Sequence, residues 1–170
     1  MTFRSQLKRL VVRRAASVVS EALQQRAHRR GGRTGGGPDA RLGGIDTTYA
    51  PEPDGQPDPG EVVWAWVPYE DDPHQGKDRP VLLIGRAGPG RWYGLHLSGQ
   101  DHRVDAQQEA RAGRYWFHLG SGPWDSKGRP SSLRLNRVLT LRADDIRREG
   151  AVLDRERYER VIAAARQYLP

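Results

Sequence analysis

The hydrophobic pattern between residues 61 and 141 predicts a series of short β-strands. Apolar, β-branched and aromatic residues gather in runs that are separated by Pro, Gly and polar residues. These runs cover residues 61–67, 81–84, 92–98, 115–119 and 133–141. The four consecutive apolar residues at 81–84 indicate a strand that is covered on both faces. Residues 100–113 are polar, and we expect them to form a loop or a short helix.

Helical patterns follow the last of these strands. Asp144 is placed to cap a short turn that ends near Gly150, and Asp154 is placed to cap a longer helix that ends near Tyr168. One face of the longer helix is apolar and comprises Tyr158, Val161, Ile162, Ala165 and Leu169. The fold class that we predict is therefore mostly β, a small barrel closed by a C-terminal helix, spanning residues 59–170.

The first third of the chain has a different pattern. Residues 3–30 place apolar side chains on one stripe at helical spacing, with basic residues mostly off it, which predicts an amphipathic helix. Residues 31–58 are rich in Gly and Pro, a composition typical of a linker that buries little apolar surface. We therefore divide the chain into a tail (1–30), a linker (31–58) and a domain (59–170).

Charge is concentrated in the tail. The whole chain has a net charge of +7, but residues 1–44 hold ten Arg or Lys against two acidic residues, a net of +8. Residues 45–170 have a net charge of −1, so a polyanion site in the domain must be a local patch. The basic tail is suited to an anionic membrane surface, to RNA or to a protein partner. The alternatives are a helix that forms only on contact and a solvated tail.

Other features of the composition limit the class of protein. The chain has no Cys, so it has neither disulfides nor thiolate metal sites. No apolar run reaches the roughly 20 residues that span a bilayer. The apolar stretch Leu10–Val12 is too short for a signal peptide, and we expect a cytoplasmic protein.

The predicted strand at 92–98 ends in a group of reactive side chains. Leu95 and Leu97 alternate with His96 and Ser98, so we expect the imidazole and the hydroxyl to lie together on the outward face. Asp101 and His102 follow directly. If the preceding strand is antiparallel to this one, Arg79 at its start lies near the same patch.

These residue types suit the cleavage of RNA without a metal. Attack of a ribose 2′-OH on the adjacent phosphorus needs a base, an acid and donors to the phosphate oxygens. No His or acidic residues have the spacing of a known metal site, and no cofactor is expected. Trp124, in a polar loop, is placed either to stack on a base or to pack over the open edge of the barrel.

Taken in order, several segments resemble the PemK/MazF family of toxin endoribonucleases. They are Gly60–Trp64, Gly76–Ile84 with its Gly-x-x-Arg-Pro-x-Leu-x-Ile pattern, Leu95–Ser98 and Pro130–Thr140. A longer match, with Asp101-His102 and Gln108–Arg111, resembles an actinobacterial branch of that family. The tail and the long segment between Ser98 and Tyr115 depart from the compact members.

The resemblance implies a small SH3-like barrel that forms a homodimer. It implies metal-independent cleavage of single-stranded RNA to 2′,3′-cyclic phosphate and 5′-OH ends, and a cognate antitoxin that covers the RNA groove. Arg79 matches the catalytic Arg of the family, Ser98 stands where Thr or Ser is usual, and Arg134 matches a basic residue used on RNA. Asn136 replaces an acidic residue that serves as base in some members, and we infer that His102 substitutes for it.

The sequence hypothesis is therefore an endoribonuclease toxin. Its expected catalytic residues are Arg79, Ser98 (a donor to the phosphate), His102 (the base) and Asp101 (which orients His102). The expected RNA-binding residues are Lys77, His96, Trp124, Arg134, Asn136 and Arg137. The hypothesis requires Arg79 and Ser98 to lie within a few ångströms of each other in an open groove. The alternative is a non-catalytic barrel module that binds nucleic acid or protein.

Overall fold

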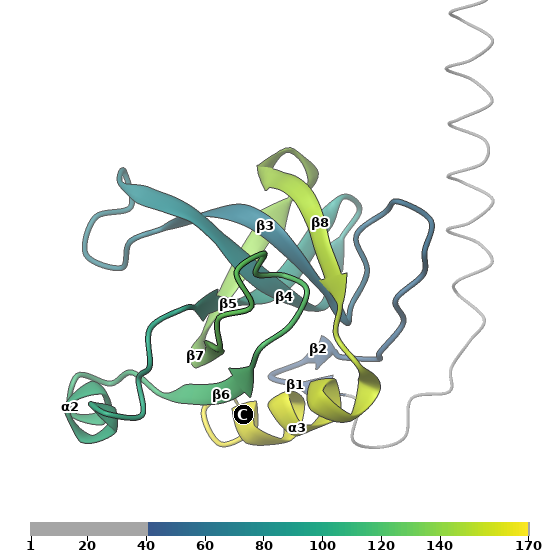
Figure 1. The fold of residues 1–170 in the computed structure, drawn as a ribbon. Helices are drawn as coiled ribbons and strands as arrows, with labels where there is room; N and C mark the ends of the chain where they lie inside the picture. The colour runs from purple at the N-terminus through teal and green to yellow at the C-terminus, as the bar shows by residue number, and fades with distance from the viewer. Residues whose placement is uncertain (1–40, 170) are drawn as a thin grey trace, which may run out of the picture. The chain divides into compact units, whose positions relative to one another are not determined.

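The domain is built on one antiparallel sheet of six strands. The computed structural model describes residues 41–169, with only the backbone described at 148–150, so the predicted helix at 3–30 lies outside the described residues. The strand order is β6-β7-β5-β4-β3-β8. The strands are β3 (Glu61–Pro68), β4 (Gly76–Gly88), β5 (Arg91–Ser98), β6 (Trp116–Gly120), β7 (Ser131–Arg142) and β8 (Ile146–Val152). Figure 1 shows the sheet strongly twisted, with the C-terminal helix α3 beneath it.

Two clusters of buried side chains lie on opposite faces of this sheet. One contains Val62, Leu82 and Leu95, together with the apolar face of α3. The other contains residues of β3, β4, β5 and β7, with Ile146 of β8 packed against it, so the sheet curls around this second cluster. Residues 81–84 contribute alternately to both clusters and are fully buried, which confirms the prediction of a strand covered on both faces.

The helix α3 (Arg155–Ala165) begins as the sequence predicts. The side chain of Asp154 accepts a hydrogen bond from the backbone N–H of Arg157, which satisfies one of the free donors of the first turn. Tyr158 on its buried face donates from its hydroxyl, which lies 3.0 Å from the carbonyl oxygen of Thr47 and 3.1 Å from that of Ile84. The fold class of a mostly β domain with a C-terminal helix is therefore confirmed.

Residues 41–58 belong to the packed domain, which corrects the boundary predicted at residue 58. The short strands β1 (Arg41–Leu42) and β2 (Ile45–Asp46) form a hairpin, and Leu42 is buried in the first cluster. The hydroxyl of Tyr49 donates to the carbonyl oxygen of Leu153 at 2.8 Å. A few well-placed apolar and aromatic side chains therefore hold this segment, although its Gly and Pro content is typical of a linker.

The structure also corrects the prediction for residues 144–150. A single turn, η1 (Ala143–Asp145), leads directly into β8, where the sequence predicts a turn that ends near Gly150. Asp145, and not Asp144, accepts the N-terminal hydrogen bond, from the backbone N–H of Arg142. The polar residues of β8 form a strand because the free edge of β3 pairs with them, a long-range contact that local sequence does not encode.

The β5–β6 segment, residues 99–115, contains a short helix, α2 (Ala106–Arg111), as its polar sequence allowed. Among residues 41–169, no helix combines the length and the apolar character that crossing a bilayer requires.

Candidate functional site

The candidate site lies where the start of β4 meets the end of β5. In the β4–β5 pairing, Val81 is opposite His96 and Leu82 is opposite Leu95. Continuing that register by two residues places Arg79 opposite Ser98, as the hypothesis of antiparallel strands requires. The β5–β6 segment and strand β7 complete the site from the other side.

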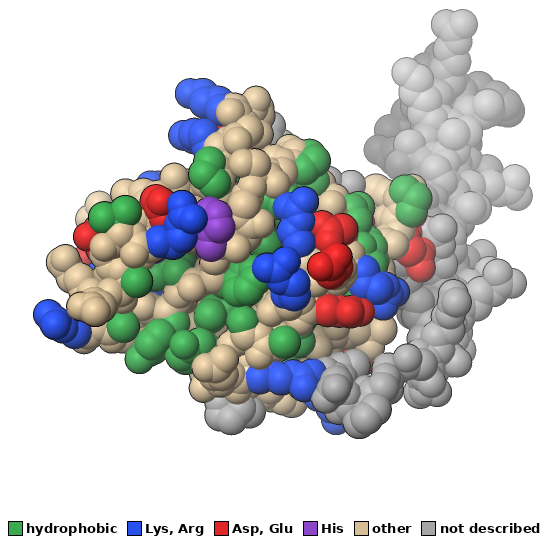
Figure 2. All heavy atoms as spheres, turned by 60° about the horizontal axis from the view of Figure 1, so that its bottom comes forward, with side chains coloured by type: hydrophobic (Ala, Val, Ile, Leu, Met, Phe, Trp, Pro, Cys, Tyr) green, Lys and Arg blue, Asp and Glu red, His purple; other side chains and the backbone are tan. Residues whose placement is uncertain are grey.

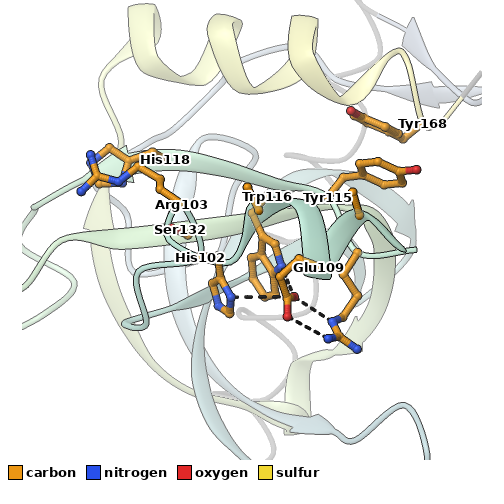
Figure 3. A pocket seen from close by; sticks show the side chains of 11 residues that line it. His102, Arg103, Glu109, Tyr115, Trp116, His118, Ser132 and Tyr168 are labelled. Carbon is orange, nitrogen blue, oxygen red and sulfur yellow. Dashed lines mark hydrogen bonds and ion pairs between the residues drawn. The ribbon is translucent and has the colours of Figure 1, made fainter. Parts of the chain in front are cut away.

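His102 occupies the centre of this site. Its Nε2 atom lies 3.1 Å from the hydroxyl oxygen of Ser98. Its ring stacks on the indole of Trp116, with the ring centroids 3.8 Å apart and the planes 3° from parallel. On the other edge of the ring, Nδ1 lies 3.8 Å from Oε2 of Glu109 (Figure 3). The imidazole is thus held between a hydroxyl, an aromatic face and a carboxylate.

Glu109 is itself fixed by two other side chains. Arg114 donates to both of its carboxylate oxygens, each at 2.7 Å, and Nε1 of Trp116 donates to Oε2 at 2.8 Å. The hydrogen bonds from Arg114 hold the pKa of Glu109 well below its usual value, so the carboxylate is ionised at neutral pH.

Arg79 brings a positive charge to the two imidazoles of the site. Its side chain is half-buried at the start of β4, and this burial lowers the pKa of the guanidinium, which stays protonated at neutral pH. The charge of Arg79 lies close enough to lower the pKa of both His96 and His102. For His102, burial is the larger cause of the lowered pKa, and the nearby Glu109 partly opposes it. His102 is therefore neutral at physiological pH, which is the form that accepts a proton.

His96 is buried, contrary to the sequence expectation of an exposed side chain. It is 4% exposed, and its Nδ1 atom has no hydrogen-bond partner in the described structure. Its ring meets the edge of Trp116 with the centroids 5.7 Å apart. Burial, with the charge of Arg79 second, lowers the pKa of His96 to about 3. A neutral, covered imidazole does not bind an RNA backbone as a cation.

Ser98 is also covered, at 5% exposed, and its hydroxyl faces His102. The predicted role as a direct donor to a phosphate does not fit this arrangement. The open groove that the sequence hypothesis requires at Arg79 and Ser98 is therefore closed at Ser98 in this structure, which corrects that prediction. The alternation in β5 does place His96 and Ser98 on the face opposite Leu95 and Leu97. Both faces of β5 are buried because the sheet is curled and the β5–β6 segment covers its end.

Two arginines of β7 are paired with Glu70 rather than free for RNA. Arg134 is buried and donates to both carboxylate oxygens of Glu70, at 3.2 and 3.1 Å, and to the side-chain oxygen of Asn136 at 2.7 Å. Arg137 donates to the carbonyl oxygen of Pro68 at 2.7 Å, and its Nε lies 3.8 Å from Glu70. These partners hold both guanidinium groups in place, and the single carboxylate of Glu70 offsets one of their two positive charges.

Three further residues predicted for the site have other surroundings than the sequence suggested. Asp101 accepts two side-chain hydrogen bonds from Arg103, each 2.9 Å long. Glu109 is the carboxylate that faces the ring of His102, the place that we predicted for Asp101. Trp124 is 2% exposed and donates to the hydroxyl of Ser131, so it packs over the barrel and does not offer its ring to a base. Lys77 is exposed at the start of β4.

Asn136 links β7 to the β5–β6 segment. Its side-chain nitrogen donates to the carbonyl oxygen of Gly113 at 2.8 Å, and its side-chain oxygen accepts from the backbone N–H of Tyr115 at 3.3 Å. Asn136, which stands where some members of the PemK/MazF family have an acidic residue, therefore has a structural role here.

A hollow of about 170 Å³ opens beside His102 (Figure 3). Its walls combine aromatic rings with cationic groups from the β5–β6 segment, β6 and the C-terminal end of the chain. The residues that line it are His102, Arg103, Ala106, Glu109, Ala110, Arg114, Tyr115, Trp116, His118, Ser132 and Tyr168. Both arginines of this lining are paired with carboxylates, Arg103 with Asp101 and Arg114 with Glu109.

The surface around α3 has no extended patch of only positive or only negative charge. Figure 2 shows acidic, basic and hydrophobic side chains side by side on the coloured part of this face. That mixture agrees with the net charge of −1 for residues 45–170. Any attraction for a polyanion within the domain must therefore come from a small group of residues, such as those around Arg79.

A separate group of carboxylates lies at 52, 54 and 58. One oxygen from each of Glu52, Asp54 and Asp58 falls within 4.8 Å of the others, a proximity that the sequence analysis did not foresee. Asp58 is buried and forms an ion pair with Arg86 at 2.7 Å. The group is not part of the site around His102.

Comparisons with known proteins give structural likenesses only. No protein-family model and no curated protein matches the chain. The solved structure of the Mycobacterium tuberculosis toxin MazF-mt6 is similar, with 17% identity, a TM-score of 0.41, and coverage of 62% of this chain and 91% of the toxin. A MazE–MazF complex from Deinococcus radiodurans shows 16% identity, a TM-score of 0.45, and coverage of 64% and 91%.

An endoribonuclease in complex with its cognate antitoxin from a mycobacterial species is also similar. It shows 14% identity and a TM-score of 0.42, with coverage of 67% of this chain and 95% of that one. The neighbours that are named MazF belong to the family that the sequence motifs resemble. These values carry no assignment of residue roles to this chain.

Sequence reasoning missed the parts that hold His102 in place. Glu109 and Trp116 are seven and fourteen positions beyond it, and neither spacing is typical of a known motif. Glu70 lies in a polar connection between two predicted strands, and its pairing with Arg134 was not predicted. Only the path of the β5–β6 segment brings Glu109 and Trp116 to the imidazole, so no local pattern could have identified them.

Proposed function

We propose that the domain is an endoribonuclease that cleaves single-stranded RNA with its own side chains. The observation that carries the proposal is the grouping of a neutral imidazole, His102, with the guanidinium of Arg79. His102 lies 3.1 Å from the hydroxyl of Ser98, and the register of β4 and β5 places Arg79 opposite that serine. A base and a fixed cation are the two groups that attack by a 2′-OH on phosphorus most needs.

The reaction proceeds by attack of the ribose 2′-oxygen on the adjacent phosphorus. His102 takes the proton from the 2′-OH, and the new O2′–P bond forms as the P–O5′ bond breaks. Arg79 donates hydrogen bonds to the phosphate oxygens and provides the proton that the leaving 5′-oxygen takes up. After the products leave, His102 gives its proton to water and the guanidine of Arg79 takes one from water, so both groups return to their starting states. The products are a 2′,3′-cyclic phosphate and a 5′-OH end. In this mechanism Ser98 orients His102 instead of contacting the phosphate, and the ribose hydroxyl replaces it at Nε2 when RNA binds.

The biological setting that we propose is a toxin–antitoxin system in the cytoplasm. The support is the ordered set of segments that resembles the PemK/MazF family, above all Gly76–Ile84 with Arg79 inside it. On this proposal the toxin is a homodimer, and a cognate antitoxin protein holds it inactive by covering the RNA-binding surface. The basic tail adds affinity for RNA or for an anionic membrane surface.

The direct test is cleavage of a defined single-stranded RNA by the purified full-length protein in the presence of EDTA. We expect cyclic phosphate and 5′-OH ends from the wild type, and a loss of at least about a hundredfold in rate for Arg79→Ala, because a donor to the developing charge is removed. Arg91→Ala is a matched control, since Arg91 is an exposed arginine at the other end of β5. Intact RNA with the wild type, or equal rates for wild type and Arg79→Ala, would contradict the proposal.

A second candidate is a non-catalytic module that binds nucleic acid or protein. The observations that favour it are the burial of Ser98 and the pairing of Arg134 and Arg137 with Glu70. This candidate predicts RNA binding without new product ends, and an affinity that falls steeply with salt because the tail carries most of the charge. Product ends in the EDTA assay decide between the two candidates.

A further inference from the structure

Glu109 makes more contacts than the stability of α2 requires, and one of them is with the ring of His102. Ser98, His102 and Glu109 form a line in which the hydroxyl lies 3.1 Å from Nε2 and the carboxylate oxygen lies 3.8 Å from Nδ1 of the same ring. The stacking of His102 on Trp116 sets the plane of the imidazole, and the indole N–H binds the same Oε2 atom. Ring plane, ring edge and carboxylate are thus fixed with respect to one another.

A purely structural role for Glu109 accounts for part of these contacts. Its two hydrogen bonds with Arg114 tie α2 to the start of β6. That tie does not require Oε2 to face Nδ1 of His102. The contact matters chemically because a neutral imidazole carries its proton on one nitrogen only, and a nearby carboxylate favours the nitrogen that faces it.

We propose that Glu109 is a positioning residue for the proposed reaction, which keeps the proton of neutral His102 on Nδ1 and thereby leaves Nε2 as the basic nitrogen. This inference rests on the proposed function. The Nε2 lone pair then accepts a hydrogen bond from the hydroxyl of Ser98 at rest and takes the 2′-OH proton of RNA during catalysis. The imidazolium that forms is stabilised by the carboxylate at 3.8 Å, which itself gives up no proton.

Several charged groups act on His102 besides Glu109, and they determine the direction of the effect. Arg114, which follows α2, and Arg79 of β4 disfavour the protonated ring, whereas Asp101 in the β5–β6 segment favours it. His96 of β5 is neutral because of its burial. When Glu109→Gln removes the carboxylate, the two arginines remain, so protonation of His102 becomes harder.

The experiment measures the pH dependence of RNA cleavage and the titration of His102 in the full-length protein. For Glu109→Gln we expect the acid limb of kcat/KM and the NMR titration of the His102 ring to move about 1 pH unit lower, the scale of a nearby opposite charge. The ring nitrogen shifts report which nitrogen carries the proton, and we expect Nδ1 in the wild type and a mixture in the variant. Glu109→Asp keeps the charge and should recover part of the shift.

Two control variants separate positioning from folding. Asp105→Asn removes one carboxylate from the same segment, at a residue that is exposed and makes no side-chain cap hydrogen bond to α2, and it should leave both curves unchanged. Trp116→Phe keeps an aromatic ring under His102 but removes the indole N–H that binds Glu109. Its effect on kcat/KM and on the His102 titration shows how much the fixed position of Glu109 matters when its charge is retained.

The outcomes distinguish the inference from the function on which it rests. Equal His102 titrations in Glu109→Gln and Asp105→Asn, with the wild type active on RNA, overturn the positioning role alone. A wild type that leaves RNA intact overturns the proposed function and the role of Glu109 in it together. The inference is supported if the acid limb of kcat/KM moves to lower pH in Glu109→Gln and stays unchanged in Asp105→Asn.

Discussion

At the scale of single residues, the two imidazoles of the site differ because of their surroundings. His96 of β5 is buried against the edge of Trp116, and the positive charges of Arg79 and Arg137 lie near it, so its protonated form is strongly disfavoured. His102 lies nearer to the surface and has a carboxylate beside it. The same residue type therefore serves as a neutral packing group in one place and as a candidate base in the other.

The buried His96 should make the stability of the domain depend on pH. Burial lowers its pKa to about 3, below the ordinary value of 6.5, so the unfolded chain binds a proton that the folded protein does not. Its stabilising contribution is therefore complete above pH 6.5 and declines as pH falls from 6.5 toward 3, by up to about 1.4 kcal/mol per pH unit.

Urea unfolding at a series of pH values checks this expectation. The free energy of unfolding of His96→Gln should fall less steeply than that of the wild type between about pH 6.5 and 5. His74→Gln, at an exposed loop position, should retain the slope of the wild type. Parallel slopes for the wild type and His96→Gln would contradict the prediction.

At the scale of elements, the connections between strands determine which side chains of the strands remain accessible. The β5–β6 segment carries His102 and Glu109 and lays them across the end of β5, where Ser98 lies. Residues 41–58 and α3 cover the opposite face of the sheet, where Tyr158 joins the two through its hydroxyl. The site is thus made by the segments between strands on a frame that the strands provide.

The cap of α3 gives a prediction at this scale. Asp154→Ala removes the acceptor for the backbone N–H of Arg157 and should lower the free energy of unfolding by about 1 kcal/mol. Chemical denaturation measures the difference. Asp144→Ala is the matched control, since Asp144 is exposed and Asp145 provides the cap of η1 instead, and it should have an effect within about 0.5 kcal/mol. An equal loss in the two variants would speak against a capping role.

At the scale of the whole molecule, charge and chemistry reside in different parts of the chain. Residues 1–44 carry a net charge of +8, while residues 45–170, which contain the candidate site, carry −1. Long-range attraction to a polyanion therefore comes mainly from the first part, and the cleavage chemistry that we propose comes from the second.

Removal of residues 1–37 tests this division, because the second unit of the chain begins at Pro38 and Leu42 is part of its core. We expect cleavage of RNA to persist, and the dependence of RNA affinity on salt concentration to become shallower, since nine Arg or Lys side chains are lost. Binding titrations over a range of salt concentrations measure the slope. A truncated protein that is folded but no longer cleaves RNA would contradict the division.

The sequence by itself determined the features that depend on local pattern. Strands at 61–68, 91–98, 116–120 and 131–142 and the helix after Asp154 follow from runs of apolar residues and from capping chemistry, which act over a few residues. The placement of Arg79 near the end of β5 also followed, because a hairpin between adjacent strands fixes their register.

Only the tertiary structure decided which of the polar residues are accessible. His96, Ser98 and Arg134 are polar residues that we expected at the surface, yet they are buried within the curled sheet. Trp124, for which the sequence left two roles open, is buried in the cluster that includes α3. The path of the β5–β6 segment brings Glu109 and Trp116 to His102. Glu70 and Arg134 form an ion pair although they are 64 positions apart in the sequence. Such contacts depend on how the chain closes in space, and no short-range pattern records them.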